Sequence, residues 1–428
     1  MILKKIGAKT IRDSRREKAI QVFIKTNKGE FRTSAPSGKS TGKYEVKPYF
    51  KNSTHDINYI NNLDADKINK IINENLGSYV SSDKKNKREQ RTDHPSKKFS
   101  INNSFKLLEK LELLIKNKIG ANSLFSLEAS LLKALAKENG QELFEFLSGK
   151  KLAGKNIKIR PVGNAIGGGL HSKGVKGKKP DFQEFLFIPK CKTFKESTKI
   201  NELAYKIARK LLKAKNRNDE GAWETGKINE GVLNTIKKIQ EIIKNKYKKQ
   251  IGIGIDAASS SFYKNNYNYK NLKRKLNSKK QTAYINRLIR DYDLFYVEDP
   301  LNENDFSGFR NLLKKTKKIS KNCLIVGDDL TTTNPERLKK AIKNKSINAI
   351  VVKPNQIGSL IKVKEVIDIA KKFKIKIIIS HRSGETLDTT ISDIAVAFQC
   401  DFIKTGIYGK EREAKLKRLI NIERKLSQ

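Results

Sequence analysis

The feature that most constrains the fold is a series of short apolar segments in the second part of the chain. Each segment is rich in Ile, Val, Leu or Phe and predicts a short, buried β-strand. The segments comprise residues 182–187, 251–255, 294–297, 323–326, 349–352, 375–379 and 402–403. Most are followed by a stretch with helical character, and this repeated alternation is typical of parallel βα units.

An ionisable side chain stands at or just beyond the end of each of the last six segments. These side chains are Asp256, Glu298, Asp328, Lys353, His381 and Lys404, separated by 42, 30, 25, 28 and 23 residues. Each interval is long enough for one βα unit, and the first interval, after Asp256, leaves room for a longer excursion of the chain. Because the parallel strands of a βα barrel end at one face, we expect these side chains to meet on a common rim. A doubly wound open sheet is the alternative, but such sheets gather their chemistry at one switch point.

Three of these residues, Asp256, Glu298 and Asp328, are carboxylates at the ends of consecutive strands. Oxygen ligands that converge on one point are what Mg²⁺ requires, so the pattern predicts a magnesium site. Lys353 and Lys404 follow later strands of the same series. A lysine held near another lysine and a divalent cation should lose part of its proton affinity, and it can then act as a base.

Two of the four histidines lie in distinctive surroundings. His171 follows the glycine-rich run 166–170, which by itself is weak evidence for a site. His381, Arg382 and Ser383 are consecutive and precede a glycine, so an imidazole, a guanidinium and a hydroxyl group stand together. These three groups together are suited to binding a phosphate, and we therefore expect an anionic substrate.

The first part of the chain follows a different pattern. Apolar and polar residues alternate at 19–24, and turn signals occur at 28–29 and 36–38. Short antiparallel strands are therefore expected before about residue 44.

Helices are expected next, near 65–76 and twice within 124–147, where Asn139-Gly140 is a stop signal. Residues 78–100 lack periodicity and predict a mobile loop, and the short polar segment 149–156 predicts a linker. These patterns divide the chain into an N-terminal α+β domain and a C-terminal catalytic barrel domain, residues 1–155 and 156–428.

The net charge of +46 is the one abnormal number in the composition. It fits nucleic-acid binding, an anionic membrane surface or a lysine-biased proteome. Lys and Asn occupy nearly every kind of polar position instead of interleaving with aromatics on one element, so we favour the bias and expect nucleic acid to bind only by non-specific electrostatics.

The three cysteines lie far apart and indicate neither a disulfide framework nor a zinc site. No signal-peptide pattern and no run of about 18 apolar residues occurs, so we expect a cytoplasmic protein without a membrane span.

Six short motifs resemble signatures of the enolase family. They occupy residues 13–15 (DSR), 36–42 (PSGKSTG), 327–331 (GDDLT), 352–358 (VKPNQIG), 380–386 (SHRSGET) and 403–406 (IKTG). The motifs stand in the family's order, and the resemblance runs from residue 7 to the C-terminus, less clearly across 50–118. It implies an α/β fold with a small N-terminal α+β domain and a C-terminal modified (βα)8 TIM-type barrel whose opening strands depart from strict parallel alternation. It also implies a homodimer or an assembly of dimers.

The resemblance implies a cytoplasmic, glycolytic lyase that removes water from 2-phosphoglycerate to give phosphoenolpyruvate, with two Mg²⁺ ions at each active site. Asp256, Glu298 and Asp328 match the family's ligands for the first, tighter Mg²⁺. Ser40 matches the loop residue that helps to bind the second Mg²⁺ when substrate is present.

By the same resemblance Lys353 is the general base that removes the proton from C2, and Glu220 is the general acid that assists departure of the C3 hydroxyl. Glu184 is similar to the carboxylate paired with that acid, and the pair can share a proton, which raises one pKa so that an acid survives at neutral pH. The remaining matches are residues around the substrate. Gln183 matches a substrate contact, and His171 matches a residue on a loop that closes over the ligand. Arg382 and Ser383 would bind the phosphate with the catalytic His381 beside them, and Lys404 would lie near the substrate carboxylate.

Several positions depart from the family's pattern. Residues 16–18 are Arg-Glu-Lys where Gly-Asn-Pro is usual, Pro354 follows the base in place of a common valine, and Ala222-Trp223 follows Gly221 in place of a second glycine. Two other interpretations therefore stay open. One is a different superfamily member that abstracts an α-proton, and the other is a catalytically inactive basic scaffold that binds nucleic acid.

Overall fold

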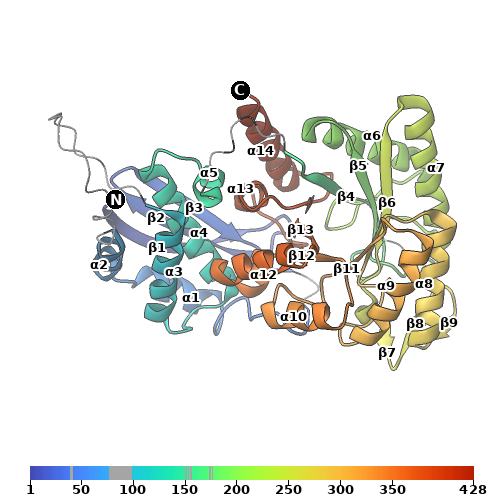
Figure 1. Ribbon diagram of the computed structural model, residues 1–428, viewed down its shortest axis with the longest axis horizontal. Helices are drawn as coiled ribbons and strands as arrows, with labels where there is room; N and C mark the ends of the chain where they lie inside the picture. The colour runs from blue at the N-terminus through green and yellow to red at the C-terminus, as the bar shows by residue number, and fades with distance from the viewer. Residues whose placement is uncertain are drawn as a thin grey trace.

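The computed structural model (Figure 1) describes residues 1–38, 42–76, 99–149, 152, 154, 157–172, 175 and 177–428. In this part of the chain a three-stranded antiparallel sheet lies near the N-terminus and a closed eight-stranded barrel occupies the second part. Figure 1 shows the sheet with helices α1 to α5 at one end of the molecule and the barrel at the other. The mobile loop predicted for residues 78–100 falls almost entirely outside the described residues.

The N-terminal strands form a meander in the order β1-β2-β3, which confirms the predicted antiparallel strands. Ile20, Val22 and Ile24 alternate along the central strand and are buried against α4. The helix predicted at 65–76 and the helix pair predicted within 124–147 are also confirmed, as α2 and as α4 with α5. The elements are β1 (Leu3–Arg12), β2 (Lys18–Thr26), β3 (Gly29–Ala35), α1 (Ser53–Asn61), α2 (Ala65–Leu76), α3 (Ile101–Ile115), α4 (Ala121–Glu138) and α5 (Leu143–Ser148).

All seven apolar segments predicted as strands belong to the closed barrel, with ends that shift by at most three residues. The barrel strands are β4 (Arg160–Gly167), β5 (Glu184–Lys190), β6 (Gln250–Asp256), β10 (Tyr296–Glu298), β11 (Leu324–Gly327), β12 (Ala349–Val352), β13 (Lys376–Ser380) and β14 (Phe402–Lys404). The apolar pattern missed β4, because a proline, two glycines and Asn164 interrupt its apolar residues.

The expectation of uniformly parallel strands is wrong for β5. This strand runs antiparallel to both of its neighbours, β4 and β6, whereas the other strand pairs of the barrel are parallel. The described part of the connection between β4 and β5, residues 168–172, 175 and 177–183, contains no helix, and the barrel opens with an antiparallel pair. This is the departure that the enolase resemblance implied.

The barrel interior changes from apolar to charged along the strand direction. A cluster of buried side chains that includes Leu186, Tyr296, Val326 and Ile378 fills its lower part. Glu298 lies two residues beyond Tyr296 and therefore points into the same interior, since side chains on a strand alternate between faces. The Tyr296 hydroxyl donates to the Glu298 carboxylate at 2.5 Å. The ionisable side chains at the strand ends thus lie at one end of a packed barrel core.

Helices cover the outside of the barrel, and none of the helices described in the structure is long and apolar enough to cross a lipid bilayer. The longer excursion predicted after Asp256 contains a second small sheet. The remaining elements are α6 (Phe194–Leu212), α7 (Asn229–Tyr247), a 3₁₀ helix (Ser259–Phe262), β7 (Tyr263–Lys264), β8 (Asn266–Tyr269), β9 (Arg274–Leu276), α8 (Ser278–Tyr292), α9 (Phe306–Ile319), α10 (Pro335–Lys343), α11 (Pro354–Ile357), α12 (Leu360–Lys372), α13 (Thr390–Ala397) and α14 (Lys410–Leu426).

A buried carboxyl group joins the N-terminal helices to the barrel. Glu128 on α4 accepts a hydrogen bond at 2.6 Å from the backbone N–H of Leu360, the first residue of α12. Glu112 on α3 lies beside it and hydrogen-bonds to it. Burial, together with the neighbouring Glu112 carboxylate, raises the pKa of Glu128 well above its ordinary value of 4.5. The folded protein therefore favours the protonated form of Glu128.

The substitution Glu128→Gln is expected to stabilise the fold at alkaline pH. Because the folded-state pKa is raised, the stability that the protonated Glu128 contributes is lost as pH rises through that pKa, whereas glutamine does not titrate. We expect the free energy of unfolding to increase by about 1–3 kcal/mol near pH 8 and to change little near pH 4. Urea denaturation at the two pH values measures this difference. Glu109→Gln, at an exposed position on α3, is the control, and an equal pH dependence in wild type and Glu128→Gln would contradict the assignment.

Candidate active site

The antiparallel direction of β5 explains how Glu184 reaches the rim. Glu184 is the first residue of β5 and pairs with Gly167 on β4 and with Asp256 on β6. Both partners end their strands, so the beginning of β5 lies level with the ends of its neighbours. A carboxylate at the start of one strand thus joins carboxylates at the ends of others.

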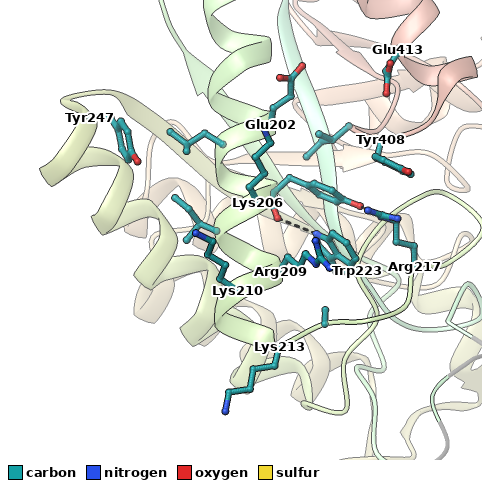
Figure 2. Close-up of a pocket in the computed structure, with 15 residues that line it drawn as sticks. Glu202, Lys206, Arg209, Lys210, Lys213, Arg217, Trp223, Tyr247, Tyr408 and Glu413 are labelled. Atoms are coloured by element: carbon teal, nitrogen blue, oxygen red, sulfur yellow. Dashed lines mark hydrogen bonds between the residues drawn. The ribbon is translucent and has the colours of Figure 1, made fainter.

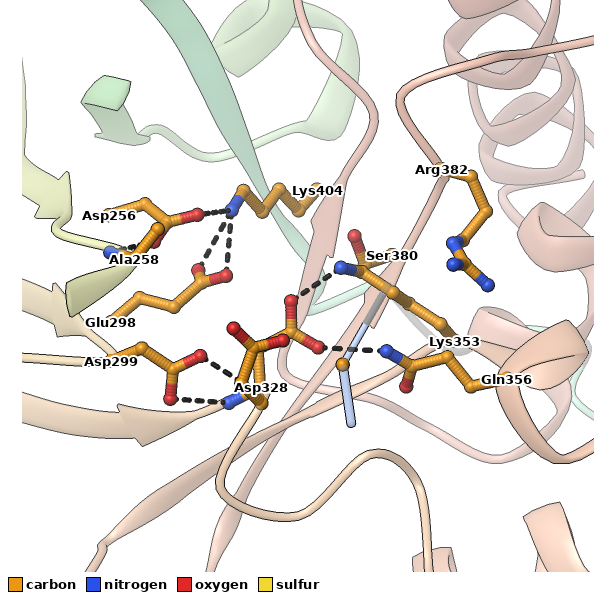
Figure 3. A network of polar contacts seen from close by, with 12 residues as sticks. Asp256, Ala258, Glu298, Asp299, Asp328, Lys353, Gln356, Ser380, Arg382 and Lys404 are labelled. Atoms are coloured by element: carbon orange, nitrogen blue, oxygen red, sulfur yellow. Dashed lines mark hydrogen bonds and ion pairs between the residues drawn. The ribbon is translucent and has the colours of Figure 1, made fainter. Parts of the chain in front are cut away.

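Lys404 lies at the centre of three carboxylates. Its Nζ is 2.9 Å from Glu184, 3.0 Å from Asp256 and 2.8 Å from Glu298, and all four side chains are buried. Figure 3 shows Asp256 and Glu298 pointing toward the Lys404 ammonium. Burial alone would lower the pKa of Lys404, but Asp256, Glu184 and Glu298 outweigh it and raise the pKa well above its ordinary value. Burial and the neighbouring Asp256 raise the pKa of Glu298 to about 8.

Lys353 pairs with Asp328, the carboxylate that follows β11. Gln356 donates a hydrogen bond to the second oxygen of Asp328 at 3.3 Å (Figure 3). Burial lowers the pKa of Lys353, but the Asp328 carboxylate outweighs burial and raises the pKa above its ordinary value. These side chains by themselves favour the protonated form of both lysines, because each ammonium faces carboxylates that stabilise its charge. The expected loss of proton affinity depends on a divalent cation and stays a prediction.

A second acidic group overlaps the predicted metal ligands. Carboxylate oxygens of Asp299, Asp328 and Asp329 lie within 4.8 Å of one another. Asp299 accepts backbone hydrogen bonds from Asp328 at 3.1 Å and from Asp329 at 2.6 Å, which fixes the turn after β11. Asp328 thus belongs to this group, whereas Asp256 and Glu298 surround Lys404. The carboxylates in both places offer the oxygen ligands that Mg²⁺ prefers.

Glu220 lies on the opposite side of the rim, on the loop between α6 and α7. It accepts a hydrogen bond from Asn164 on β4 at 3.0 Å, and its other oxygen is 3.2 Å from Nδ1 of His171. Asp219 is also 3.3 Å from that nitrogen. Burial lowers the pKa of His171, but Glu220 and Asp219 outweigh it and raise the pKa to about 10. His171 is therefore positively charged at neutral pH.

Glu184 and Glu220 form a hydrogen-bonded carboxyl pair in which the two pKa values shift in opposite directions. Burial and the nearby Glu220 charge raise the pKa of Glu184 well above its ordinary value. Burial would also raise the pKa of Glu220, but the charge of His171 and its hydrogen bond outweigh it and hold that pKa well below the ordinary value. These opposite shifts favour a proton on Glu184 that is hydrogen-bonded to an ionised Glu220.

The predicted phosphate-binding residues follow β13 at the edge of the same site. Arg382 forms a buried ion pair with Glu45, with an N–O distance of 2.7 Å. Gly38 lies so close that an added Cβ would stand 2.4 Å from the Arg382 guanidinium. Burial and the nearby Arg412 lower the pKa of His381 well below its ordinary value, so the imidazole is neutral. Ser40, the predicted ligand of a second Mg²⁺, lies outside the described residues.

One small cavity gathers most of the predicted site. Its lining comprises Gly38, His171, Gln183, Glu184, Glu220, Asp256, Lys353, Ser380, His381, Arg382, Ser383 and Lys404. Glu298 and Asp328 lie next to this lining through their contacts with Lys404 and Lys353. A larger cavity of about 860 Å³ lies outside the barrel beside α6. That larger cavity lacks the lysines surrounded by carboxylates, so we place the candidate active site in the smaller one.

The residues at the site that were missed from the sequence include Asn164, Glu45 and Asp299. Asn164 had a weak signal, since it is the one amide side chain in β4, but the strand itself was not recognised. Asp299 also had a signal, because the two neighbouring acid pairs 298–299 and 328–329 end consecutive strands. Glu45 had none, since its partner Arg382 lies 337 residues further along the chain.

Comparisons with known proteins cover nearly the whole chain. The family model "Enolase, N-terminal domain" matches residues 3–147, and "Enolase, C-terminal TIM barrel domain" matches residues 157–428. Curated enolases from Picrophilus torridus and Archaeoglobus fulgidus are 34% and 32% identical over 431 residues, covering 99% of this chain and 99% and 97% of the relatives. The enolase of Methanocorpusculum labreanum is 35% identical over 97% of both chains. With both family domains matched in order around this rim of carboxylates and lysines, the chain belongs to the enolase family.

Proposed function

We propose that this chain is a phosphopyruvate hydratase, a glycolytic lyase that removes water from 2-phosphoglycerate to give phosphoenolpyruvate. The observation that carries the proposal is the small cavity into which Lys353, Glu220 and Arg382 converge from separate parts of the barrel rim. A base, a proton-donating carboxyl pair such as Glu184–Glu220 and a phosphate-binding cation are the groups that this elimination needs. The enolase names of the full-length relatives support the same assignment.

The residues at the rim fit a magnesium cofactor. Asp256, Glu298 and Asp328 would hold the first Mg²⁺, and carboxylate oxygens of Asp299 and Asp329 lie within 4.8 Å of that of Asp328. Ser40 would contribute to a second Mg²⁺ that arrives with the substrate. Bound there, Mg²⁺ supplies positive charge that stabilises the charge developing on the substrate carboxylate. The same positive charge would compete with the lysines for their carboxylates and lower the proton affinity of Lys353.

The protein's own side chains divide the remaining work. Lys353, in its neutral form, accepts the proton from C2, while Arg382 and Ser383 orient the phosphate and Lys404 lies by the substrate carboxylate. On the other side, the Glu184–Glu220 pair holds the proton that the C3 hydroxyl takes up as it leaves as water. The charged His171 keeps Glu220 ionised until that proton is transferred through the pair. Base and acid therefore act from opposite sides of the cavity.

The activity assay follows the ultraviolet absorbance of phosphoenolpyruvate after 2-phosphoglycerate and Mg²⁺ are added. We expect the signal to appear with the wild-type protein, to vanish with a chelator and to return with excess Mg²⁺. Absence of the signal at saturating Mg²⁺ would contradict the proposal, and it would favour a different α-proton-abstracting reaction or a non-enzymatic role.

The substitution Asp328→Asn is expected to remove the thermal stabilisation that Mg²⁺ gives to the wild type. A cation at a hundredfold its dissociation constant stabilises a fold by about 2.7 kcal/mol, and weaker binding reduces this term. Melting curves with and without Mg²⁺ measure the effect in the absence of substrate. Asp368→Asn, on the exposed side of α12, is the control, and an unchanged Mg²⁺ shift in Asp328→Asn would contradict its role as a ligand.

We also propose that the protein acts in the cytoplasm as a homodimer or an assembly of dimers, and that its domains divide between residues 155 and 156. Sedimentation of the purified protein tests the dimer. Limited proteolysis near residue 155 tests the division, because cleavage concentrates at exposed linkers.

A further inference from the structure

We propose that Tyr205, on α6 outside the barrel, is a positioning residue that fixes the backbone beside Glu220 for the elimination step. The inference rests on the proposed function, in which Glu220 belongs to the proton-donating pair. Tyr205 lines the larger cavity beside α6 and does not line the cavity of the active site. Its effect on the chemistry therefore has to pass through the loop that carries Glu220.

The Tyr205 hydroxyl makes two directed hydrogen bonds. It donates to the carbonyl oxygen of Gly221, the residue after Glu220, at 2.5 Å, and it accepts from Nε of Arg217 at 2.7 Å. A phenol has one proton, and the bond from Arg217 leaves that proton free to point at the carbonyl. Burial, only partly offset by Arg217, raises the pKa of Tyr205 to about 12, so the hydroxyl keeps its proton at any pH near neutrality.

Aromatic rings pack against Arg217 and against the Tyr205 ring. The Arg217 guanidinium carbon lies 4.1 Å from the ring centre of Trp223 and 3.8 Å from that of Tyr408. Tyr205 stacks on Trp223 with ring centres 4.9 Å apart, and the Trp223 indole N–H donates to the Tyr205 carbonyl at 3.0 Å. Figure 2 shows Arg217 next to Trp223 on the cavity wall. Cation–π contacts of this kind favour one position of the guanidinium.

The inner side of the loop is fixed independently by Asn218. Its side-chain oxygen accepts from the backbone N–H groups of Glu220 and Ala222, both at 3.0 Å. The space for this amide exists because residue 167 is glycine, since a Cβ there would lie 2.2 Å from the Asn218 nitrogen. Gly221 has a φ of 82°, which only glycine adopts readily. Asn218 thus holds one side of the turn and Tyr205 holds the carbonyl on the other, with Glu220 between them.

Removing the hydroxyl should loosen the Gly221 peptide without removing any group that touches substrate. In Tyr205→Phe we expect kcat for dehydration to fall by about 10- to 100-fold, since a misplacement of about 1 Å can cost a factor of that size. Exchange of the C2 proton and KM should stay within about twofold of wild type, because Lys353 and Arg382 do not contact this loop. Arg217→Leu should give the same division of effects, and the double variant should lose little more than either single one.

Tyr408→Phe is the matched control, because it also removes one phenolic hydroxyl but keeps the ring beside Arg217. It should leave both reactions unchanged. Hydrogen–deuterium exchange of the backbone around residues 218–223 supplies a readout without substrate, and exchange there should be faster in Tyr205→Phe than in Tyr408→Phe. Melting temperatures of the variants show whether the fold as a whole is weakened.

The outcomes separate this inference from the proposed function. A wild-type protein without dehydratase activity would contradict the proposed function. Unchanged hydrogen–deuterium exchange of the backbone at 218–223 in Tyr205→Phe would contradict the positioning role. Equal loss of dehydration and of C2 exchange would also overturn the positioning role, because it would show general damage to the site.

Discussion

In Lys353→Ala, exchange of the C2 proton of 2-phosphoglycerate with solvent is expected to fall by at least about 10²- to 10⁴-fold, and dehydration with it. Lys353 is the lysine at the end of β12 that pairs with Asp328 and lines the active-site cavity. A proton next to a carboxylate is very weakly acidic, so loss of the base removes the first step of the reaction. Incubation in deuterated water, with NMR detection of the C2 position, measures this step separately from elimination.

Lys353→Arg separates the base from the positive charge. Arginine keeps a cation beside Asp328, but it cannot lose its proton near neutral pH. It should therefore be nearly as inactive as alanine in the exchange reaction. Lys362→Ala, a substitution on α12 away from the cavity, should leave exchange unchanged. Substantial exchange by Lys353→Arg would show that the charge matters and that another group is the base.

In Glu220→Gln, dehydration is expected to fall by about 10²- to 10⁴-fold while C2 exchange falls by much less. Glutamine can keep the hydrogen bond with Asn164, so the loop should hold its place. It cannot pass on a proton, and the C3 hydroxyl then has to leave without an acid. The ratio of exchange to product formation should rise above the wild-type ratio, whereas equal losses in both reactions would contradict separate acid and base roles.

Glu184→Gln tests where the proton is stored. The raised pKa of Glu184 favours a proton on this side chain, and a glutamine can donate the same hydrogen bond to Glu220 while its oxygen faces Lys404. The geometry should persist, but the stored proton is gone. Dehydration should therefore fall in this variant too, again with smaller loss of C2 exchange. Normal dehydration by Glu184→Gln would assign the proton to His171 instead.

The positions of the strand ends could be predicted from the sequence, because each position depends on a few neighbouring residues. Apolar runs such as 349–352 bury themselves whatever lies far away in the chain, and the ionisable residue that follows each run is placed at the rim by the direction of the strand. The same logic could not find β4, whose glycines, proline and Asn164 read locally as a turn. Nor could it find the reversed direction of β5, since an apolar run is the same in either direction.

The barrel, the N-terminal meander and helices, the family and most of the residues that meet at the rim could be predicted from the amino-acid sequence. The tertiary fold was needed to find which opening strand is reversed, the opposite pKa shifts of Glu184 and Glu220, the raised pKa of Lys353 and Lys404, and the contacts of Tyr205 and Glu45. The physical reason is the distance along the chain over which each kind of interaction acts. Strand and turn preferences act over a few residues, whereas a pKa inside a low-dielectric core depends on charges a few ångströms away that come from distant parts of the chain, as with Lys404 and Asp256, 148 residues apart.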